Sequence, residues 1–176
     1  MTPQWRRLAG SLCLVTALTG CTDAGPASER PPSRTVLGQR NVAVIGQGAM
    51  QGTSWRVDLV SADGKLCTQA TVGGNPAGSG CEPPVSKEVP VNIALDGLNS
   101  GVLLVYGAAD PSVTRLVARS TSGETRAIDI TAHEGKSFFA YALKPGTAED
   151  LMAFDSGGQQ VFSAAEKIRE FQTPAG

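Results

Sequence analysis

The stretch SWRVDLVSADGKLCTQATV, residues 54–72, decides the fold class of this 176-residue chain. Its first half alternates in polarity, so that Trp55, Val57 and Leu59 share one face of an extended strand and charged residues take the other face. The Ala-Asp-Gly sequence at 62–64 is typical of a tight turn, and the residues after it form a returning strand. The stretch therefore predicts a β-hairpin with one apolar face.

Further strands follow along the chain. Alternation places Val91, Ile93 and Leu95 on one face of a strand, whereas GVLLVYG at 101–107 is apolar throughout, as expected of a strand covered on both sides. Three more strand segments are predicted at 112–131 (a hairpin with Ile128 and Ile130 inward and Asp129 outward), 136–146 and 149–163 (another hairpin). No βαβ pattern occurs. We therefore expect an all-β, immunoglobulin-like two-sheet antiparallel sandwich of about 8–10 short strands over residues 41–163.

The glycines in NVAVIGQGAMQG, residues 41–52, resemble the start of a dinucleotide-binding loop. Such a loop must lead into a helix whose N-terminus meets the pyrophosphate. Here the following segment is the period-2 strand at Trp55, and Gln51 occupies the position of the third glycine. The segment is therefore interpreted as a first strand followed by a glycine-rich turn that lets the chain pass close to Trp55. No nucleotide cofactor is expected.

One helix is predicted, at the C-terminal end. In SAAEKIREF, Ser163 and Glu166 have the spacing of a capping box, and Ile168 and Phe171 lie three apart on one face. Residues 164–176 are therefore expected to form a short helix and a tail.

The first residues predict export. Arg6 and Arg7 precede 13 uncharged residues, too few for a transmembrane helix but typical of a signal peptide over residues 1–20. The run ends in LTGC, which resembles the lipobox of bacterial lipoproteins. That resemblance implies a diacylglycerol on Cys21, stable anchoring of the acylated chain in the membrane, and cleavage just before that residue. Residues 21–40 are polar and rich in proline and serine, and indicate a flexible tether with a root-mean-square span of roughly 25 Å.

The net charge of the chain excludes one class of partner. Without Arg6 and Arg7, 13 basic and 16 acidic residues remain, a net charge of about −3, and no basic block is left. Nucleic acid is therefore not an expected partner. The expected partners are the lipid bilayer, through acylated Cys21, and an envelope protein or glycan of unknown identity.

The cysteines divide by position. Cys13 belongs to the predicted signal peptide and Cys21 to the lipidation site, which leaves Cys67 and Cys81 as a pair in an oxidising compartment. We expect these two to form a disulfide, which the chain-entropy model values at about 3 kcal/mol for a loop of this size. Two thiols without neighbouring histidine make a poor metal site, so no metal is expected.

No catalytic constellation is evident. His133, the single histidine, is expected in a loop, with Glu134 pointing to the opposite side of an extended chain. No Gly-x-Ser-x-Gly nucleophile motif occurs. The aspartates are expected to be turn residues or part of a solvated strand face: Asp58, Asp63, Asp96, Asp110, Asp129, Asp150 and Asp155.

The aromatic side chains are interpreted as core residues in preference to a ligand platform, because they make up only 5% of the chain. They are Trp55, Tyr106, Phe138, Phe139, Tyr141, Phe154 and Phe162. A tryptophan often packs on the disulfide of a β-sandwich, and Trp55 is the candidate for that contact with Cys67.

The segments GTSWRVDLVSADGKLC, GSGC, VYGAADPSVTRLVARSTSG, FFAYALKPG and LMAFDSGGQ resemble a group of uncharacterised actinobacterial lipoproteins and secreted proteins over about residues 50–163. The resemblance implies the compartment, a two-cysteine segment and a β-fold. It implies no catalytic residue.

Taken together, these features predict a membrane-anchored extracytoplasmic lipoprotein that is not an enzyme and serves as a binding or interaction module at the cell envelope. The alternatives are an exported hydrolase whose site forms only on folding, and an inhibitor or accessory subunit of an envelope enzyme. A fold class alone does not decide between them.

Overall fold

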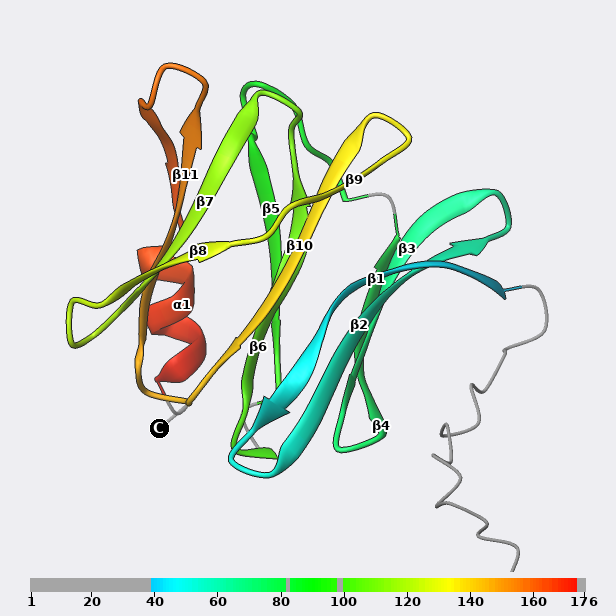
Figure 1. The fold of residues 1–176 in the computed structure, drawn as a ribbon, viewed down its shortest axis with the longest axis horizontal. Helices are drawn as coiled ribbons and strands as arrows, with labels where there is room; N and C mark the ends of the chain where they lie inside the picture. Colours follow the sequence, from blue (N-terminus) through cyan, green and yellow to red (C-terminus); the bar gives the residue numbers. More distant parts are fainter. Residues whose placement is uncertain (1–38, 82, 98–99, 174–176) are drawn as a thin grey trace, which may run out of the picture. The chain divides into compact units, whose positions relative to one another are not determined.

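The computed structural model describes residues 39–81, 83–97 and 100–173. These residues form twelve β-strands, paired antiparallel, and one helix (Figure 1). The predicted signal peptide 1–20, the predicted lipidation site Cys21 and the predicted tether up to residue 38 lie outside the described residues. The structure therefore bears on the strand-rich part of the chain.

Sheet A is a meander of four strands that lie in sequence order. They are β1 (Gln39–Met50), β2 (Thr53–Ala62), β3 (Lys65–Val72) and β4 (Asn75–Cys81). Each connection has two residues of positive φ, as in a type I′ turn, whose twist matches that of the strands. The turn residues are Gln51-Gly52, Asp63-Gly64 and Gly73-Gly74. The hairpin predicted over 54–72 is thereby confirmed as β2 and β3.

The first strand is longer than the sequence predicts. β1 continues through Gly46 and Gly48, which were expected in a turn. A Cβ atom at Gly46 would lie 3.2 Å from the Trp55 ring, and one at Gly48 would lie 3.1 Å from the Trp55 Nε1. These glycines therefore make room for Trp55, as predicted, but they do so from within the strand.

Strand β4 is absent from the sequence-based prediction, because glycine, proline and serine have low strand propensity. Its Gly78 explains part of its composition. A Cβ atom there would overlap the carboxylate of Asp96 and the hydroxyl of Tyr106, two groups of the neighbouring sheet. Glycine at this position therefore permits β4 to pack closely against that sheet.

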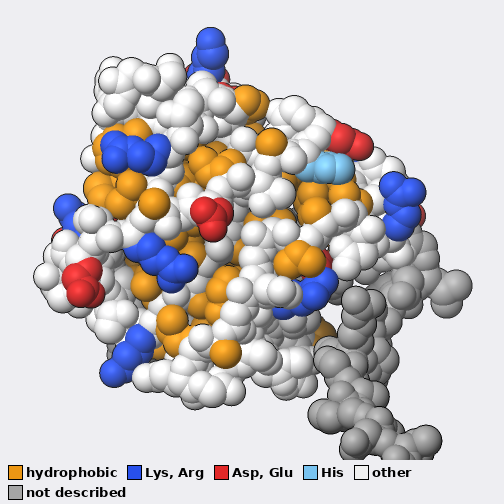
Figure 2. Space-filling model, in the orientation of Figure 1, with side chains coloured by type: hydrophobic (Ala, Val, Ile, Leu, Met, Phe, Trp, Pro, Cys, Tyr) orange, Lys and Arg blue, Asp and Glu red, His pale blue; other side chains and the backbone are white. Residues whose placement is uncertain are grey.

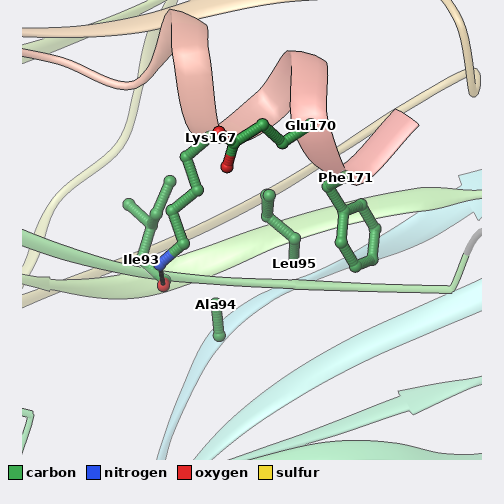
Figure 3. A pocket seen from close by; sticks show the side chains of 6 residues that line it. All are labelled: Ile93, Ala94, Leu95, Lys167, Glu170 and Phe171. Carbon is green, nitrogen blue, oxygen red and sulfur yellow. Dashed lines mark hydrogen bonds between the residues drawn. The ribbon is translucent and has the colours of Figure 1, made fainter. Parts of the chain in front are cut away.

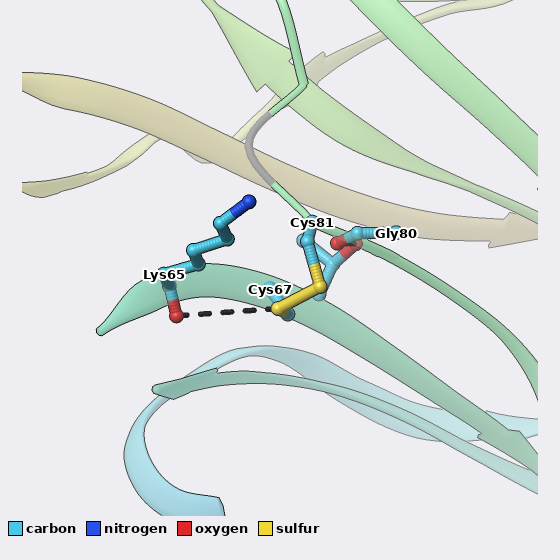
Figure 4. Close-up of a disulfide and its surroundings, with 5 residues drawn as sticks. Lys65, Cys67, Gly80 and Cys81 are labelled. Atoms are coloured by element: carbon cyan, nitrogen blue, oxygen red, sulfur yellow. Dashed lines mark hydrogen bonds between the residues drawn. A yellow bond between two sulfur atoms is a disulfide. The ribbon is translucent and has the colours of Figure 1, made fainter. Parts of the chain in front are cut away.

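The predicted disulfide between Cys67 and Cys81 is confirmed (Figure 4). The two residues are directly opposite each other on β3 and β4, so the bridge joins neighbouring strands of sheet A. The predicted packing of Trp55 on this disulfide is wrong. Cys67 pairs with Val60, which lies five residues from Trp55 along β2 and therefore about 17 Å away and on the opposite face.

The other eight strands form two sheets. Sheet B has the order β5-β6-β10-β9, with β5 (Val91–Asp96), β6 (Leu103–Ala109), β9 (Thr131–His133) and β10 (Lys136–Leu143). Sheet C has the order β12-β11-β7-β8, with β7 (Val113–Ser120), β8 (Thr125–Ile128), β11 (Ala148–Asp155) and β12 (Gln160–Ser163). Helix α1 (Ala165–Gln172) follows β12 and confirms the predicted C-terminal helix.

Sheet B is the middle layer, between sheet A and sheet C (Figure 1). Alternate residues of its strands enter two separate hydrophobic clusters. In β6, Leu103 and Val105 belong to the cluster shared with sheet C, and Leu104 and Tyr106 belong to the cluster shared with sheet A. Both faces of β6 are therefore buried, as its unbroken apolar sequence predicts.

The predicted all-β sandwich is confirmed, but the structure has more sheets and more strands than the sequence predicts. It has three four-stranded sheets where two were predicted, because the apolar face of sheet A covers the second face of sheet B. It has twelve strands where 8–10 were predicted. One added strand is β4, and the other arises because the segment 124–131 is divided between β8 in sheet C and β9 in sheet B.

The predicted core role of the aromatic residues is confirmed for six of the seven. Four are buried, each at most 2% exposed: Tyr106, Phe138, Phe139 and Tyr141. Trp55 and Phe162 are partly buried and pack against the two clusters. Phe154 lies outside both clusters, where the Arg115 guanidinium carbon is 4.1 Å from its ring centre.

Candidate functional site

His133 lies at the end of the short strand β9, with its imidazole partly exposed. Its Nε2 is 3.7 Å from the Glu134 carboxylate, so the prediction that these side chains point apart is wrong. The reason is that Glu134 has a φ of 47° in the turn after β9, which breaks the alternation of an extended chain. Within the described ranges, no hydrogen bond joins His133 to a serine, threonine or tyrosine hydroxyl.

The aspartates behave as predicted at four positions. Asp63, Asp110 and Asp155 lie in or beside turns, and Asp129 is exposed. Hydrogen bonds from the hydroxyl and the backbone of Ser112 lower the pKa of Asp110. In the part of the chain that the structure describes, no three histidine, cysteine or acidic side chains gather as metal ligands.

Three aspartates have more specific contacts. Asp58 accepts three hydrogen bonds of 2.7–2.9 Å from Arg56 on the outer face of sheet A. Asp96 accepts a hydrogen bond of 2.6 Å from the Tyr106 hydroxyl. Asp150 is only 3% exposed, so the prediction of a turn or a solvated face is wrong for this residue.

A groove of about 510 Å³ lies between strand β5 and helix α1 (Figure 3). We call it the β5–α1 groove. Its lining is apolar on the strand side and mixed on the helix side: Ile93, Ala94, Leu95, Lys167, Glu170 and Phe171. Lys167 and Glu170 are the two ionisable residues among these, and both are exposed. The groove therefore combines an apolar floor with one charge of each sign.

Strand β5 is an edge strand of sheet B, and one side of its backbone faces this groove. Asp110, the residue after β6, donates a hydrogen bond of 2.8 Å from its N–H to the Pro90 carbonyl. Because backbone groups of a strand alternate in direction, the even-numbered residues of β5 direct their N–H and C=O groups toward β6. Odd-numbered residues therefore direct theirs outward. The Ile93 carbonyl, accordingly, accepts a hydrogen bond of 2.7 Å from Lys167 Nζ, and the N–H and C=O of Leu95 point the same way.

Helix α1 is held in place by hydrogen bonds at both ends. At its start, the Asp150 carboxylate accepts hydrogen bonds of 2.9 Å from the Ala164 N–H and the Ser163 hydroxyl. At its end, the Gln172 side chain donates to the Ala148 carbonyl at 2.9 Å. Ile168 is fully buried beneath the helix. The predicted capping box of Ser163 and Glu166 does not form, because the helix begins one residue later, with Ala164 as its N-cap, and no side chain caps it.

The sequence predicts the strand and the helix that form the two walls of the groove, but not the contact between them. The strand at Val91 and the helix at Ile168 are each indicated by local periodicity. Lys167 carries no such signal, since a charged residue beside a buried one is ordinary on a surface helix. The contact between Lys167 and Ile93 joins residues 74 positions apart, and only the folded chain brings them together.

Charged side chains of both signs are scattered over the face shown in Figure 2, among patches of exposed apolar atoms. This face shows no block of a single charge. Among the described residues, the one helix is too short and too polar to cross a membrane.

The chain matches no family model, no curated protein and no solved structure.

Proposed function

We propose that this protein is a membrane-anchored extracytoplasmic lipoprotein whose β-sandwich serves as a binding module at the cell envelope, with the β5–α1 groove as its binding site. The lipobox-like LTGC ending at Cys21 supports the anchor. The Cys67–Cys81 disulfide supports an oxidising compartment. The observation that carries the binding role is the groove itself, which sets apolar side chains beside a strand edge that pairs with no other strand and that Lys167 covers at Ile93.

The chemistry of the groove favours binding over catalysis. Its two ionisable side chains are exposed, and Lys167 is engaged with the backbone carbonyl of Ile93. A nucleophile needs an adjacent base to activate it, and the residues that line this groove include neither serine, cysteine nor histidine. Apolar walls with a few placed polar groups are instead typical of binding sites.

The position of the groove also suits a partner in the envelope. The described chain begins with β1 in sheet A, whereas α1 and sheet C lie on the other side of sheet B (Figure 1). The groove is therefore on the side of sheet B away from the first described strand, which leaves it free for a partner.

Photo-cross-linking in native envelopes tests this proposal. A benzophenone amino acid is placed at Glu170, which is exposed and lines the groove, and in a second variant at Arg126, which is exposed on β8. We expect a discrete cross-linked product from the Glu170 position and none from the Arg126 position, because only the first lies in the groove. The product is identified by mass spectrometry of the purified adduct.

The Cys21→Ser variant is the control for the anchor. We expect it to leave the membrane fraction and to lose the cross-linked product, because the acyl chains supply stable attachment. A wild-type chain found without lipid in the soluble fraction contradicts the lipoprotein assignment. Equal cross-linking at both positions, or none at either, contradicts the groove as a binding site.

A further inference from the structure

We infer that the ligand of the β5–α1 groove is an extended polypeptide segment, which pairs with β5 as an added strand and offers a carboxylate to Lys167. This inference rests on the proposed function and names the chemistry of its partner. It is carried by three features of the groove: the direction of the free backbone groups, the position of Lys167 and the shape of the apolar lining.

The outward backbone groups of β5 are those that an added strand requires. The N–H and C=O of half-buried Leu95 both point away from β6, and the Ile93 N–H points the same way from a residue that is only 5% exposed while Lys167 covers it. None of these groups has a backbone partner among the described residues. Edge strands of this kind bind extended segments, in which main-chain hydrogen bonds supply affinity and pockets for alternate side chains supply specificity.

Lys167 protects this edge in the free protein. Its Nζ donates to the Ile93 carbonyl at 2.7 Å and occupies the position where the N–H of an added strand would bind. Lysine at a strand edge is a common device against unwanted pairing. An incoming strand must displace this ammonium group, and a carboxylate on the ligand compensates by pairing with it.

The two ends of the groove favour different ligand side chains. Lys167 lies at the Ile93 end, whereas Phe171 lies beside Leu95 (Figure 3). Ala94, between Ile93 and Leu95 on the strand, directs its side chain to the other face of sheet B, so only its backbone lies between the two ends. We therefore expect an acidic residue at the Ile93 end of the ligand and an apolar residue at the Leu95 end.

A second copy of this chain is a poorer occupant. Pairing of β5 with β5 would displace two lysines, and the one carboxylate on this strand, Asp96, already accepts the Tyr106 hydroxyl on the face toward sheet A. A glycan is poorer too, because it lacks peptide N–H groups at strand spacing. An extended peptide pairs with the backbone groups, and its carboxylate pairs with Lys167, one of the two charged side chains that line the groove.

Selection from a display library of random ten-residue peptides tests the inference, with the full chain purified from membranes in detergent as the target. We expect the enriched peptides to alternate apolar residues and to share an aspartate or glutamate. On addition of an enriched peptide, amide exchange should slow at Ile93 and Leu95 and stay unchanged at Asn92 and Ala94, whose N–H groups already face β6.

A matched pair of variants at Leu95 tests the backbone donor, because one variant removes the N–H and the other keeps it. Leu95→Pro deletes an N–H that β6 does not use, which an edge strand tolerates, whereas Leu95→Ala truncates the side chain and keeps the N–H. We expect the enriched peptide to bind Leu95→Pro about tenfold more weakly than Leu95→Ala. Melting curves of both variants confirm that the sandwich remains folded, and the wild-type amide exchange provides the same test without a substitution.

A double-mutant cycle tests the charge. The wild-type chain should bind the enriched peptide about threefold more tightly than the same peptide with glutamine in place of its acid, and Lys167→Ala should abolish that difference.

The inference is overturned if the selected peptides show no alternation and no acid, if Leu95→Pro and Leu95→Ala bind them equally, or if protection appears in the absence of peptide through a concentration-dependent dimer. These results leave the proposed function standing if Glu170 still cross-links a partner in envelopes. Loss of that cross-link alone would contradict the proposed function instead.

Discussion

Two buried tyrosines differ in what their hydroxyl groups contact. The Tyr106 hydroxyl donates to the Asp96 carboxylate at 2.6 Å, in the cluster between sheets A and B. The Tyr141 hydroxyl lies in the cluster between sheets B and C, and it has no hydrogen-bond partner among the described residues. The same residue type therefore contributes a hydrogen bond at one position and an unpaired polar atom at the other.

This difference predicts opposite effects of removing each hydroxyl. Tyr106→Phe should lower the free energy of unfolding by about 1–2 kcal/mol, because the Asp96 carboxylate loses a donor. Tyr141→Phe should leave stability unchanged or raise it, because an unpaired buried hydroxyl is removed. Urea unfolding at pH 7 measures both. Equal losses in the two variants would show that ring packing, and not the hydroxyl partner, sets the effect.

At the scale of elements, the position of α1 depends on a residue of β11. Asp150 accepts hydrogen bonds from the Ala164 N–H and the Ser163 hydroxyl, and its carboxylate lies 3.8 Å from an Arg119 nitrogen. The sequence predicts a different cap, a capping box formed by Ser163 and Glu166. Local spacing cannot reveal Asp150, because it reaches the helix from a neighbouring strand.

A helix start held by Asp150 and one capped by Glu166 predict different effects of substitution. Asp150→Ala should destabilise the chain by about 1–2 kcal/mol and increase amide exchange in α1 more than in β6, because the start of the helix loses its acceptor. Glu166→Ala is the control and should change stability by less than about 0.5 kcal/mol, since this side chain makes no capping hydrogen bond. Amide exchange and thermal unfolding measure both. A larger loss of stability in Glu166→Ala than in Asp150→Ala would show that the capping box forms.

The local pattern of apolar and polar residues predicts some strands and misses others, for physical reasons. β2, β5 and β6 are recovered because their apolar periodicity is strong. β4 is not, because its NPAGSGC sequence has no periodicity and gains its strand conformation by pairing with β3 and by packing over Asp96. Propensity is a weak guide wherever tertiary contacts supply the stabilisation.

At the scale of the whole molecule, the two clusters on either side of sheet B each hold a tyrosine whose pKa is raised above its ordinary value. Burial is the main cause of the raised pKa of both Tyr106 and Tyr141. The hydrogen bond to Asp96 and its negative charge raise the pKa of Tyr106 further, and the negative charge of Asp150 raises that of Tyr141. In the unfolded chain both groups return to a pKa of about 10.

Stability should therefore fall in alkaline solution. Below pH 10 both states keep these protons and the contribution is fully present, whereas above pH 10 the unfolded state ionises first and stability falls by about 1.4 kcal/mol per pH unit for each tyrosine. Urea unfolding between pH 8 and pH 11.5 measures the slope. The Tyr106→Phe, Tyr141→Phe double variant should lose less over the same interval. An unchanged slope in that variant would assign the alkaline loss to other groups.

The sequence by itself determined the all-β class, the apolar faces of most strands, the disulfide and the C-terminal helix, because each depends on nearby residues or on a count of cysteines. It also predicts the anchor at Cys21, which lies outside the described residues. Only the tertiary structure decided that there are three sheets, that Asp150 holds α1, and that Lys167 covers the edge of β5. These features join residues far apart in the chain, so no local pattern encodes them and only the packed layers bring them into contact.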